Sequence, residues 1–189
     1  DFVIGKDYIV TTRYDTVDPL HKFSKVFEVR SILDRSDIGE HAGYVLFYML
    51  RKLYRAVEHE LEFLNDELRV IEARIFNGQE RDMVFALSRV QRTLLSFRQA
   101  LRPHEEILES LERAGERFFG EEFRFHLKGI SGEYFRVYSA IRSLGESLQE
   151  LRETNNSLLS TKQNEIMKIL TVVAFITLPL SLFATLLQL

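Results

Sequence analysis

The stretch Thr161-Lys-Gln-Asn-Glu-Ile-Met-Lys-Ile-Leu-Thr171 leads without a break into an apolar run from Val172 to Leu189. From Ile169 to Leu189 no side chain is ionisable. That length matches the roughly 20 apolar residues that a helix needs to cross a bilayer. The sequence therefore predicts a membrane-spanning helix over 169–189, which is entered from a polar and charged segment.

The residues before this run predict a very long helix that continues into it. From Tyr134 onward, apolar residues recur at steps of three and four between Val137 and Leu158, the spacing of a coiled-coil seam. A helix from about Glu121 to the end of the chain would be on the order of 100 Å long. We expect such a helix to be a stalk that bundles with copies of itself. Asn155 falls on the seam, either as a buried residue that fixes the register or as part of a solvated kink.

Two further helices are predicted over 40–76 and 79–119, and Asn77-Gly78 between them favours an antiparallel hairpin. Pro103 should kink the second helix. His104 lies on its seam without a second ligand at metal-binding spacing, so we interpret it as a partly exposed, hydrogen-bonding histidine. The predicted seams are Leu46, Leu50, Leu53, Val57, Leu61, Leu64, Leu68, Ile71 and Ile75, and then Met83, Leu87, Val90, Leu94, Phe97, Leu101, His104, Leu108, Leu111, Gly115 and Phe118.

The first fourteen residues carry the only clear β pattern. Phe2–Ile4 and Tyr8–Tyr14 flank Gly5-Lys6-Asp7, which predicts two strands around a tight turn. Two strands alone are marginal in water, so we expect them to belong to a larger sheet; an extended tail is the alternative. Asp18-Pro19 predicts a helix start, and Asp37 to Gly39 a break.

Composition excludes several classes of protein. The chain of 189 residues has a net charge of -3, which argues against a nucleic-acid binder. It has no cysteine, so disulfides and thiolate metal sites are excluded. A Gly-rich phosphate loop, an HExxH motif and a nucleophile-elbow serine are all absent from the sequence, so we do not expect an enzyme. The acidic residues are spread over helix surfaces, as a solvated face or, less favoured, as a surface that attracts cations.

The residues Asn164-Glu-Ile-Met-Lys-Ile-Leu-Thr171, followed eight residues on by Pro179-Leu180, resemble the start of the first transmembrane helix of CorA-like divalent-cation transporters. The resemblance implies a homopentamer in the cell (inner) membrane, in contact with lipid, that transports Mg²⁺ or Co²⁺. It also implies a cytoplasmic N-terminal portion, which Lys162 and Lys168 support by the positive-inside bias. Mg²⁺ would be both the transported ion and a regulator that closes the pore from the cytoplasm.

With this resemblance the predicted fold is mainly α with a small β part. Residues 1–38 would be the remnant of a cytoplasmic α/β domain and 39–120 the long antiparallel helical hairpin. Residues 121–168 would form the stalk helix, and 169–189 a truncated first transmembrane helix. The sequence has no initiator Met and stops within or at the end of its apolar run, so we expect a piece that has lost sequence at both ends. The family's Gly-Met-Asn motif is expected near Gln188-Leu189 and is not found there, so either it lies beyond the end of this piece or it is absent.

One face of the predicted span gathers small and polar side chains. The resemblance implies that this face lines the pore, with Asn164 at its mouth. Because Mg²⁺ dehydrates reluctantly, amide and hydroxyl oxygens would meet its water shell, and a ring of Leu178 would act as a dewetting constriction. Ordinary packing of membrane helices uses the same residue types, so periodicity alone leaves both interpretations open. The predicted pore-lining residues are Asn164, Met167, Leu170, Thr171, Ala174, Leu178 and Ser181.

Two alternatives compete with a Mg²⁺ transporter. The first is a Zn²⁺ transporter of the same superfamily, which transport of Zn²⁺ in preference to Mg²⁺ would reveal. The second is a membrane-anchored coiled-coil scaffold without transport activity. The sequence names no regulatory metal ligand.

Overall fold

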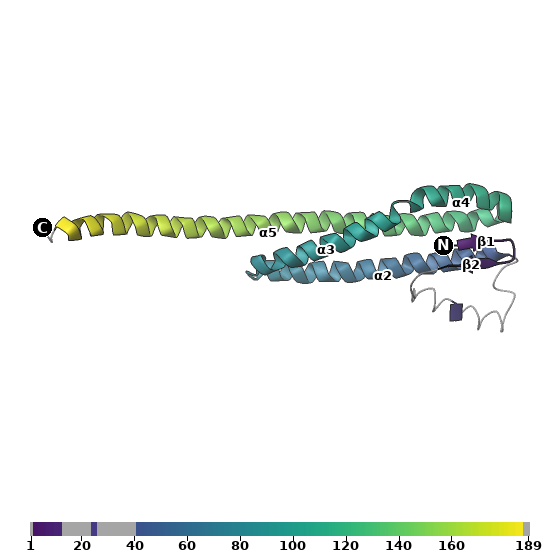
Figure 1. Ribbon diagram of the computed structural model, residues 1–189, viewed down its shortest axis with the longest axis horizontal. Helices are drawn as coiled ribbons and strands as arrows, with labels where there is room; N and C mark the ends of the chain where they lie inside the picture. The colour runs from purple at the N-terminus through teal and green to yellow at the C-terminus, as the bar shows by residue number, and fades with distance from the viewer. Residues whose placement is uncertain (1, 13–23, 26–40, 187–189) are drawn as a thin grey trace. The chain divides into compact units, whose positions relative to one another are not determined.

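The computed structural model describes residues 2–12, 24–25 and 41–186. These residues form strands β1 (Phe2–Ile4) and β2 (Ile9–Thr11), helices α2 (Ala42–Phe76), α3 (Glu80–Leu101) and α4 (His104–Phe119), a short 3₁₀ turn (Glu121–Phe123) and helix α5 (Arg124–Leu186) (Figure 1). The mainly α fold with a small β part is confirmed. The predicted helix start at Asp18-Pro19 and the predicted break from Asp37 to Gly39 lie outside the described residues.

The chain divides into two compact units. Unit 1 holds residues 1–67 and 91–145, and unit 2 holds 68–90 and 146–189. Helices α2, α3 and α5 therefore each contribute a segment to both units. The candidate span lies in unit 2, together with the turn that joins α2 to α3.

The two strands of unit 1 form an antiparallel hairpin, in which Phe2 lies opposite Thr11 and Ile4 opposite Ile9. The amide of Gly5 donates a 2.8 Å hydrogen bond to the carbonyl of Tyr8, which closes the turn. The predicted strand pair is therefore confirmed against the extended tail, with a shorter second strand than predicted. The amide of Ala42 donates to the carbonyl of Lys6 at 2.8 Å, so the hairpin is joined to the first turn of α2.

Helix α2 buries most of its predicted seam, but not all of it. Both ends of the predicted seam are buried, whereas Leu50, Leu53 and Val57 in the middle are only half-buried. Met49 and Tyr54 are buried in their place. The centroid of the Tyr54 ring lies 6.2 Å from that of the Tyr134 ring of α5. In this part of α2, the buried face is therefore the one that carries Tyr54.

The predicted single helix over 79–119 is two helices, because the chain breaks at Arg102-Pro103. Proline has no N–H to donate into a helix. The Arg102 amide still bonds the Arg98 carbonyl at 3.0 Å, and the Pro103 carbonyl accepts from the Ile107 amide at 3.2 Å. The helix thus restarts at once. The predicted seam residues Leu108 and Gly115 are buried after the break, whereas the predicted seam residue Phe118 is exposed.

Helix α5 begins three residues after the predicted position and has 63 residues, which corresponds to roughly 95 Å at 1.5 Å per residue. Gly120, before the 3₁₀ turn that leads into it, has a φ of 99°, a backbone conformation that glycine adopts without strain. The predicted seam residues from Val137 to Leu151 are buried. Asn155 is 1% exposed inside an unbroken helix, so the buried-residue interpretation is confirmed and the solvated kink is wrong.

Candidate functional site

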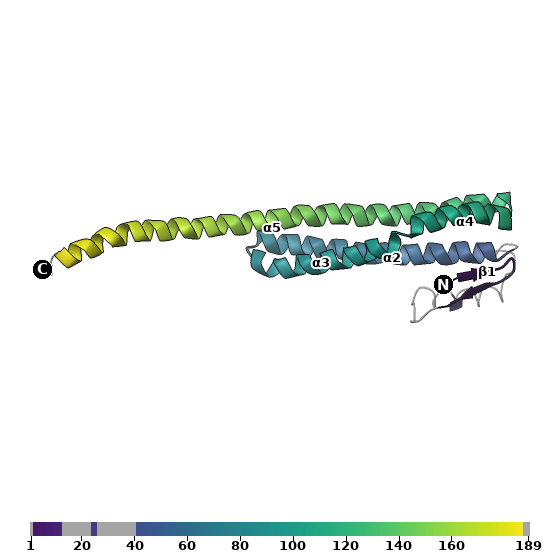
Figure 2. The same ribbon diagram turned by 45° about the horizontal axis from the view of Figure 1, so that its top comes forward.

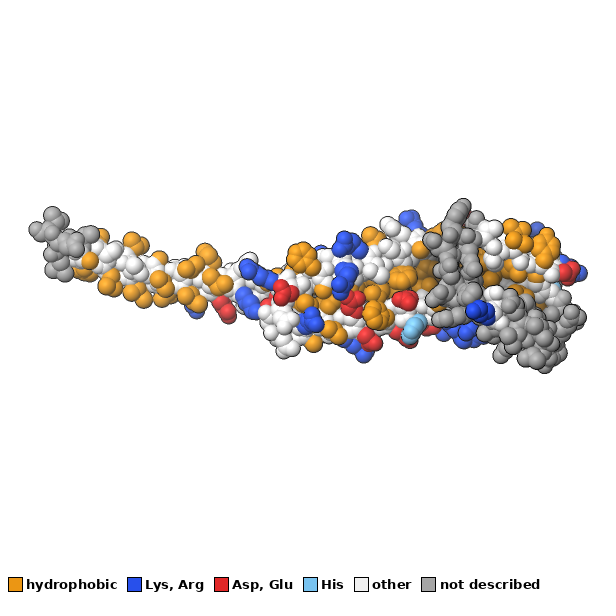
Figure 3. All heavy atoms as spheres, turned by 60° about the horizontal axis from the view of Figure 1, so that its bottom comes forward, with side chains coloured by type: hydrophobic (Ala, Val, Ile, Leu, Met, Phe, Trp, Pro, Cys, Tyr) orange, Lys and Arg blue, Asp and Glu red, His pale blue; other side chains and the backbone are white. Residues whose placement is uncertain are grey.

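The seven predicted pore-lining residues all lie on the C-terminal part of α5. At 3.6 residues per turn they fall within an arc of about 120° around the helix axis, so they share one face. All side chains from Ile166 to Ala184 are exposed in the single chain. Among the described residues, this helix is long and apolar enough to cross a membrane. The space-filling view shows this end of the chain covered mostly by hydrophobic side chains (Figure 3).

The hydroxyl groups on this face donate back to the helix that carries them. Thr171 Oγ1 donates to the carbonyl of Met167 at 2.8 Å, and Ser181 Oγ donates to that of Leu178 at 2.8 Å. A hydroxyl has one donor and two acceptor lone pairs. Because the Thr171 hydroxyl donates within the helix, its oxygen can accept a hydrogen bond from outside the helix. The waters that surround a hydrated cation can donate such a hydrogen bond.

Pro179 lies inside the same stretch of α5. Its nitrogen carries no hydrogen, so the carbonyl of Phe175, one turn earlier, loses its intrahelical donor. Such a position bends a helix, and α5 curves toward its C-terminal end in the second view (Figure 2). Pro179 directly follows Leu178, so the proline and the predicted constriction occupy the same turn of the helix.

A buried carboxylate fixes the α2–α3 turn to α5 just before the apolar run. Lys162 Nζ lies 2.6 Å from Glu80 Oε2 and 3.5 Å from the carbonyl of Gly78. The Glu80 side chain is only 6% exposed. The hydrogen bond from Lys162 lowers the pKa of Glu80, so its carboxylate remains ionised at neutral pH. The position of Lys162, seven residues before Ile169, is thereby held by the hairpin.

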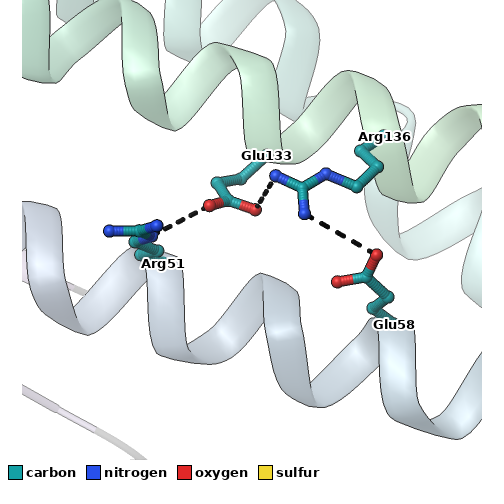
Figure 4. Close-up of polar contacts among 4 residues, drawn as sticks. All are labelled: Arg51, Glu58, Glu133 and Arg136. Atoms are coloured by element: carbon teal, nitrogen blue, oxygen red, sulfur yellow. Dashed lines mark hydrogen bonds and ion pairs between the residues drawn. The ribbon is translucent and has the colours of Figure 1, made fainter.

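A second buried carboxylate joins α5 to α2 within unit 1 (Figure 4). Glu133 is 7% exposed and accepts from Arg51 Nε at 2.9 Å and from Arg136 at 2.8 Å. Arg136 also lies 3.8 Å from Glu58 on α2. Charges taken out of water need such partners on each side. The four side chains alternate in charge, so the stem of α5 is bound to α2 through a continuous ionic network.

The His104 side chain has a hydrogen-bond partner within unit 1. Its Nδ1 is hydrogen-bonded to the Tyr54 hydroxyl at 2.9 Å. Burial lowers the pKa of His104 and raises the pKa of Tyr54, so both groups are neutral at physiological pH. The structure thus confirms the interpretation of His104 as a half-buried, hydrogen-bonded residue at the helix break.

The described residues contain no cluster of three metal-binding side chains. Among residues 2–12, 24–25 and 41–186, no three histidine or acidic side chains come together so that they could hold a metal ion. The acidic residues of α2 and α4 instead lie dispersed over the helix surfaces, as the sequence predicted.

The family model described as CorA-like Mg²⁺ transporter protein matches residues 1–187. The chain belongs to this family. Members of the CorA-like family are membrane transporters, and the exposed apolar segment of α5 agrees with that setting. The match covers the β hairpin, the α2–α3 hairpin and the long α5 helix alike. The resemblance carried by Asn164 to Leu180 therefore extends to almost the whole chain.

Two curated relatives share part of their length with this chain. The chain is 26% identical over 145 residues to the cobalt/magnesium transport protein CorA of Thermotoga maritima, which covers 77% of this chain and 41% of that protein. It is 24% identical over 168 residues to the protein of the same name from Methanocaldococcus jannaschii, covering 89% and 51%. The chain thus spans about half the length of the curated relatives that it matches.

A solved structure shows the shared fold directly. The complete structure of the CorA magnesium transporter from Methanocaldococcus jannaschii matches with a TM-score of 0.77 at 23% identity, over 88% of this chain and 52% of that one. The long helices of this chain are therefore those of the CorA fold.

The seven predicted pore-lining residues from Asn164 to Ser181, called the stripe below, were found from the sequence pattern. The two buried carboxylates were not. Each of them lies on a seam that could have been extended backward. Glu80 stands three residues before Met83, and Glu133 stands four before Val137. A charged residue at a seam position was the signal that a partner from another helix had to be present.

Proposed function

We propose that this chain is the cytoplasmic stem and first membrane span of a CorA-type Mg²⁺ transporter. In the proposed assembly, five copies place the stripe from Asn164 to Ser181 around a central pore. The observation that carries the proposal is the exposed apolar segment of α5, with small and polar side chains gathered on one face. A lone helix in lipid gains nothing from such a face, whereas a bundle uses it for packing or for water.

The chemistry of the stripe suits a hydrated cation. The oxygen of Thr171 can accept hydrogen bonds, because its hydroxyl already donates to the Met167 carbonyl at 2.8 Å. The Asn164 amide offers a further acceptor two turns earlier. Mg²⁺ usually keeps several of its waters, and those waters donate to such oxygens. Leu178 narrows the path beyond them and excludes water when the pore is closed.

Flux through the full-length protein in liposomes tests the proposal, with Mg²⁺, Co²⁺ and Zn²⁺ compared. We expect Asn164→Ala to lower Mg²⁺ flux, while Glu165→Gln, on the opposite side of the helix from the stripe, leaves it nearly unchanged. We expect Leu178→Ser to raise flux by hydrating the constriction, and Leu180→Ser, on another face, to have no such effect. Transport of Zn²⁺ alone would favour the related zinc transporters, and no flux of any ion would favour a scaffold.

Regulation by cytoplasmic Mg²⁺ belongs to the same proposal. In the proposed regulation, cytoplasmic Mg²⁺ binds between neighbouring subunits, through acidic side chains on the helix surfaces. Mg²⁺ would then hold the stalks together and the pore closed. Protease sensitivity of the full-length protein, measured with and without Mg²⁺, should fall when the ion is present. Equal sensitivity in both conditions would contradict this part of the proposal.

A further inference from the structure

The turn between α2 and α3 presents a large apolar side chain to its surroundings. Phe76, the last residue of α2, is 65% exposed. Asn77, Gly78 and Gln79 after it are exposed as well. Other aromatic rings of the described residues are equally exposed, among them Phe63 and Phe85. What distinguishes Phe76 is its place at the turn between the two helices.

The turn lies close to the apolar run. Lys162 holds it through Glu80 and the Gly78 carbonyl, and seven residues separate Lys162 from Ile169. At 1.5 Å per residue this is about 10 Å. The headgroup layer adds roughly 5 to 7 Å on each side of the hydrocarbon core. The headgroup layer of a bilayer that begins at Ile169 would thus end roughly 3 to 5 Å from the level of Lys162, which is within the length of a Phe or Arg side chain at the turn.

The chemistry around Phe76 fits a lipid surface. Arg74 and Arg81 stand on either side of the turn and are exposed, and guanidinium groups bind phosphates in a planar, two-pronged geometry. Of the two acidic residues in the first turn of α3, Glu80 is neutralised by Lys162 at 2.6 Å and Asp82 is exposed beside Arg81. A single ring is also far too small for a stable contact between proteins, which takes about 800 Å² per partner.

We propose that the α2–α3 turn is a membrane-surface contact, in which Phe76 enters the headgroup layer and Arg74 and Arg81 bind lipid phosphates. The inference rests on the proposed function only in requiring that α5 cross the bilayer. The Glu80–Lys162 pair then links the hairpin, the stem and the membrane surface at one level. The hairpin would thereby hold the stem at a fixed height above the span.

Tryptophan fluorescence of the full-length protein tests this. Residues 1–189 contain no tryptophan, and any tryptophan elsewhere in the full-length protein is first replaced by phenylalanine. Phe76→Trp places one fluorophore at the turn, in vesicles of mixed zwitterionic and anionic lipid. Lipids that carry a quencher near the headgroup should reduce its emission roughly twofold or more, because interfacial aromatic side chains lie at that depth. The matched control is Phe63→Trp, which is 68% exposed on the same helix but lies farther from the turn, and it should not be quenched.

Phe175→Trp, within the span, separates this inference from the proposed function. Quenching of F175W by deep-acyl quenchers without quenching of F76W by headgroup quenchers would overturn the membrane contact and leave the span in place. A blue-shifted F76W emission without lipid quenching would also overturn it, because another protein surface would then cover the ring. Absence of quenching for F175W would overturn both proposals.

Discussion

Glu133 lies between two arginines on the buried side of α5, and its removal should weaken unit 1. We expect Glu133→Ala to lower the free energy of unfolding by about 1–3 kcal/mol, because it removes hydrogen bonds from two charged arginines to one carboxylate. Arg51 and Arg136 are partly exposed, so water recovers some of the loss. Chemical unfolding followed by circular dichroism measures the change.

The matched control for Glu133 is Glu62→Ala. Glu62 and its partner His59 are both exposed, at 3.4 Å from each other. Exposed ion pairs contribute about 0–1 kcal/mol, so this variant should unfold nearly like the unchanged chain. Equal effects of the two substitutions would show that the network around Glu133 contributes no more than a surface pair.

His104 makes stability depend on pH. Burial lowers the pKa of His104 below its usual 6.5, so the folded chain favours the neutral imidazole more than the unfolded chain does. The resulting stabilisation is complete above the unfolded pKa and is lost as the pH falls from there through the folded pKa. Between about pH 7 and pH 5, around the ordinary histidine range, the free energy of unfolding should fall more for the unchanged chain than for His104→Gln.

If His104→Gln and the unchanged chain had parallel pH profiles, the burial of His104 would not be coupled to protonation.

At the scale of the element, helices could be predicted from the sequence better than the contacts between them. Steps of three and four located α2 and α5 closely, because a helix repeats its buried face with a fixed period. The same rule could not foresee that Tyr54 would replace its neighbours in the core, since that depends on the Tyr134 ring from a distant part of the chain. It could not foresee the restart after Pro103 either, because a kink and a break leave the same sequence pattern.

The seam of α5 contains one polar residue whose effect can be measured. Asn155 is buried, and among the residues that the structure describes its Oδ1 has no hydrogen-bond partner. An unsatisfied buried acceptor costs about 1–3 kcal/mol, so Asn155→Leu should raise the free energy of unfolding. Asn156→Leu, one residue on and exposed, should leave it nearly unchanged. A loss of stability in Asn155→Leu would contradict the expectation that the unpaired oxygen destabilises the chain.

At the scale of the whole molecule, the sequence predicts the span but does not determine which face of its helix meets water. The apolar run and the motif at Asn164 identify a membrane helix of the CorA-like family. Which face of that helix meets water depends on copies of the chain around it. A periodic stripe fits a pore and a packed helix interface equally well, so only an assembled protein can distinguish them.

Ala174 lies on the stripe and Val173 does not, at nearly the same depth in the membrane, so the two positions can distinguish a pore from a packed interface. They are adjacent on α5, so they differ in height by about 1.5 Å and in direction by about 100°. The chain has no cysteine, so Ala174→Cys and Val173→Cys each introduce one thiol into it. If the stripe lines a water-filled pore, a water-soluble thiol reagent should modify A174C much faster than V173C in membranes, because a thiol reacts as its thiolate and needs access to water. Slow modification of both would mean that the stripe is a dry interface between helices, and the pore would then have to lie elsewhere.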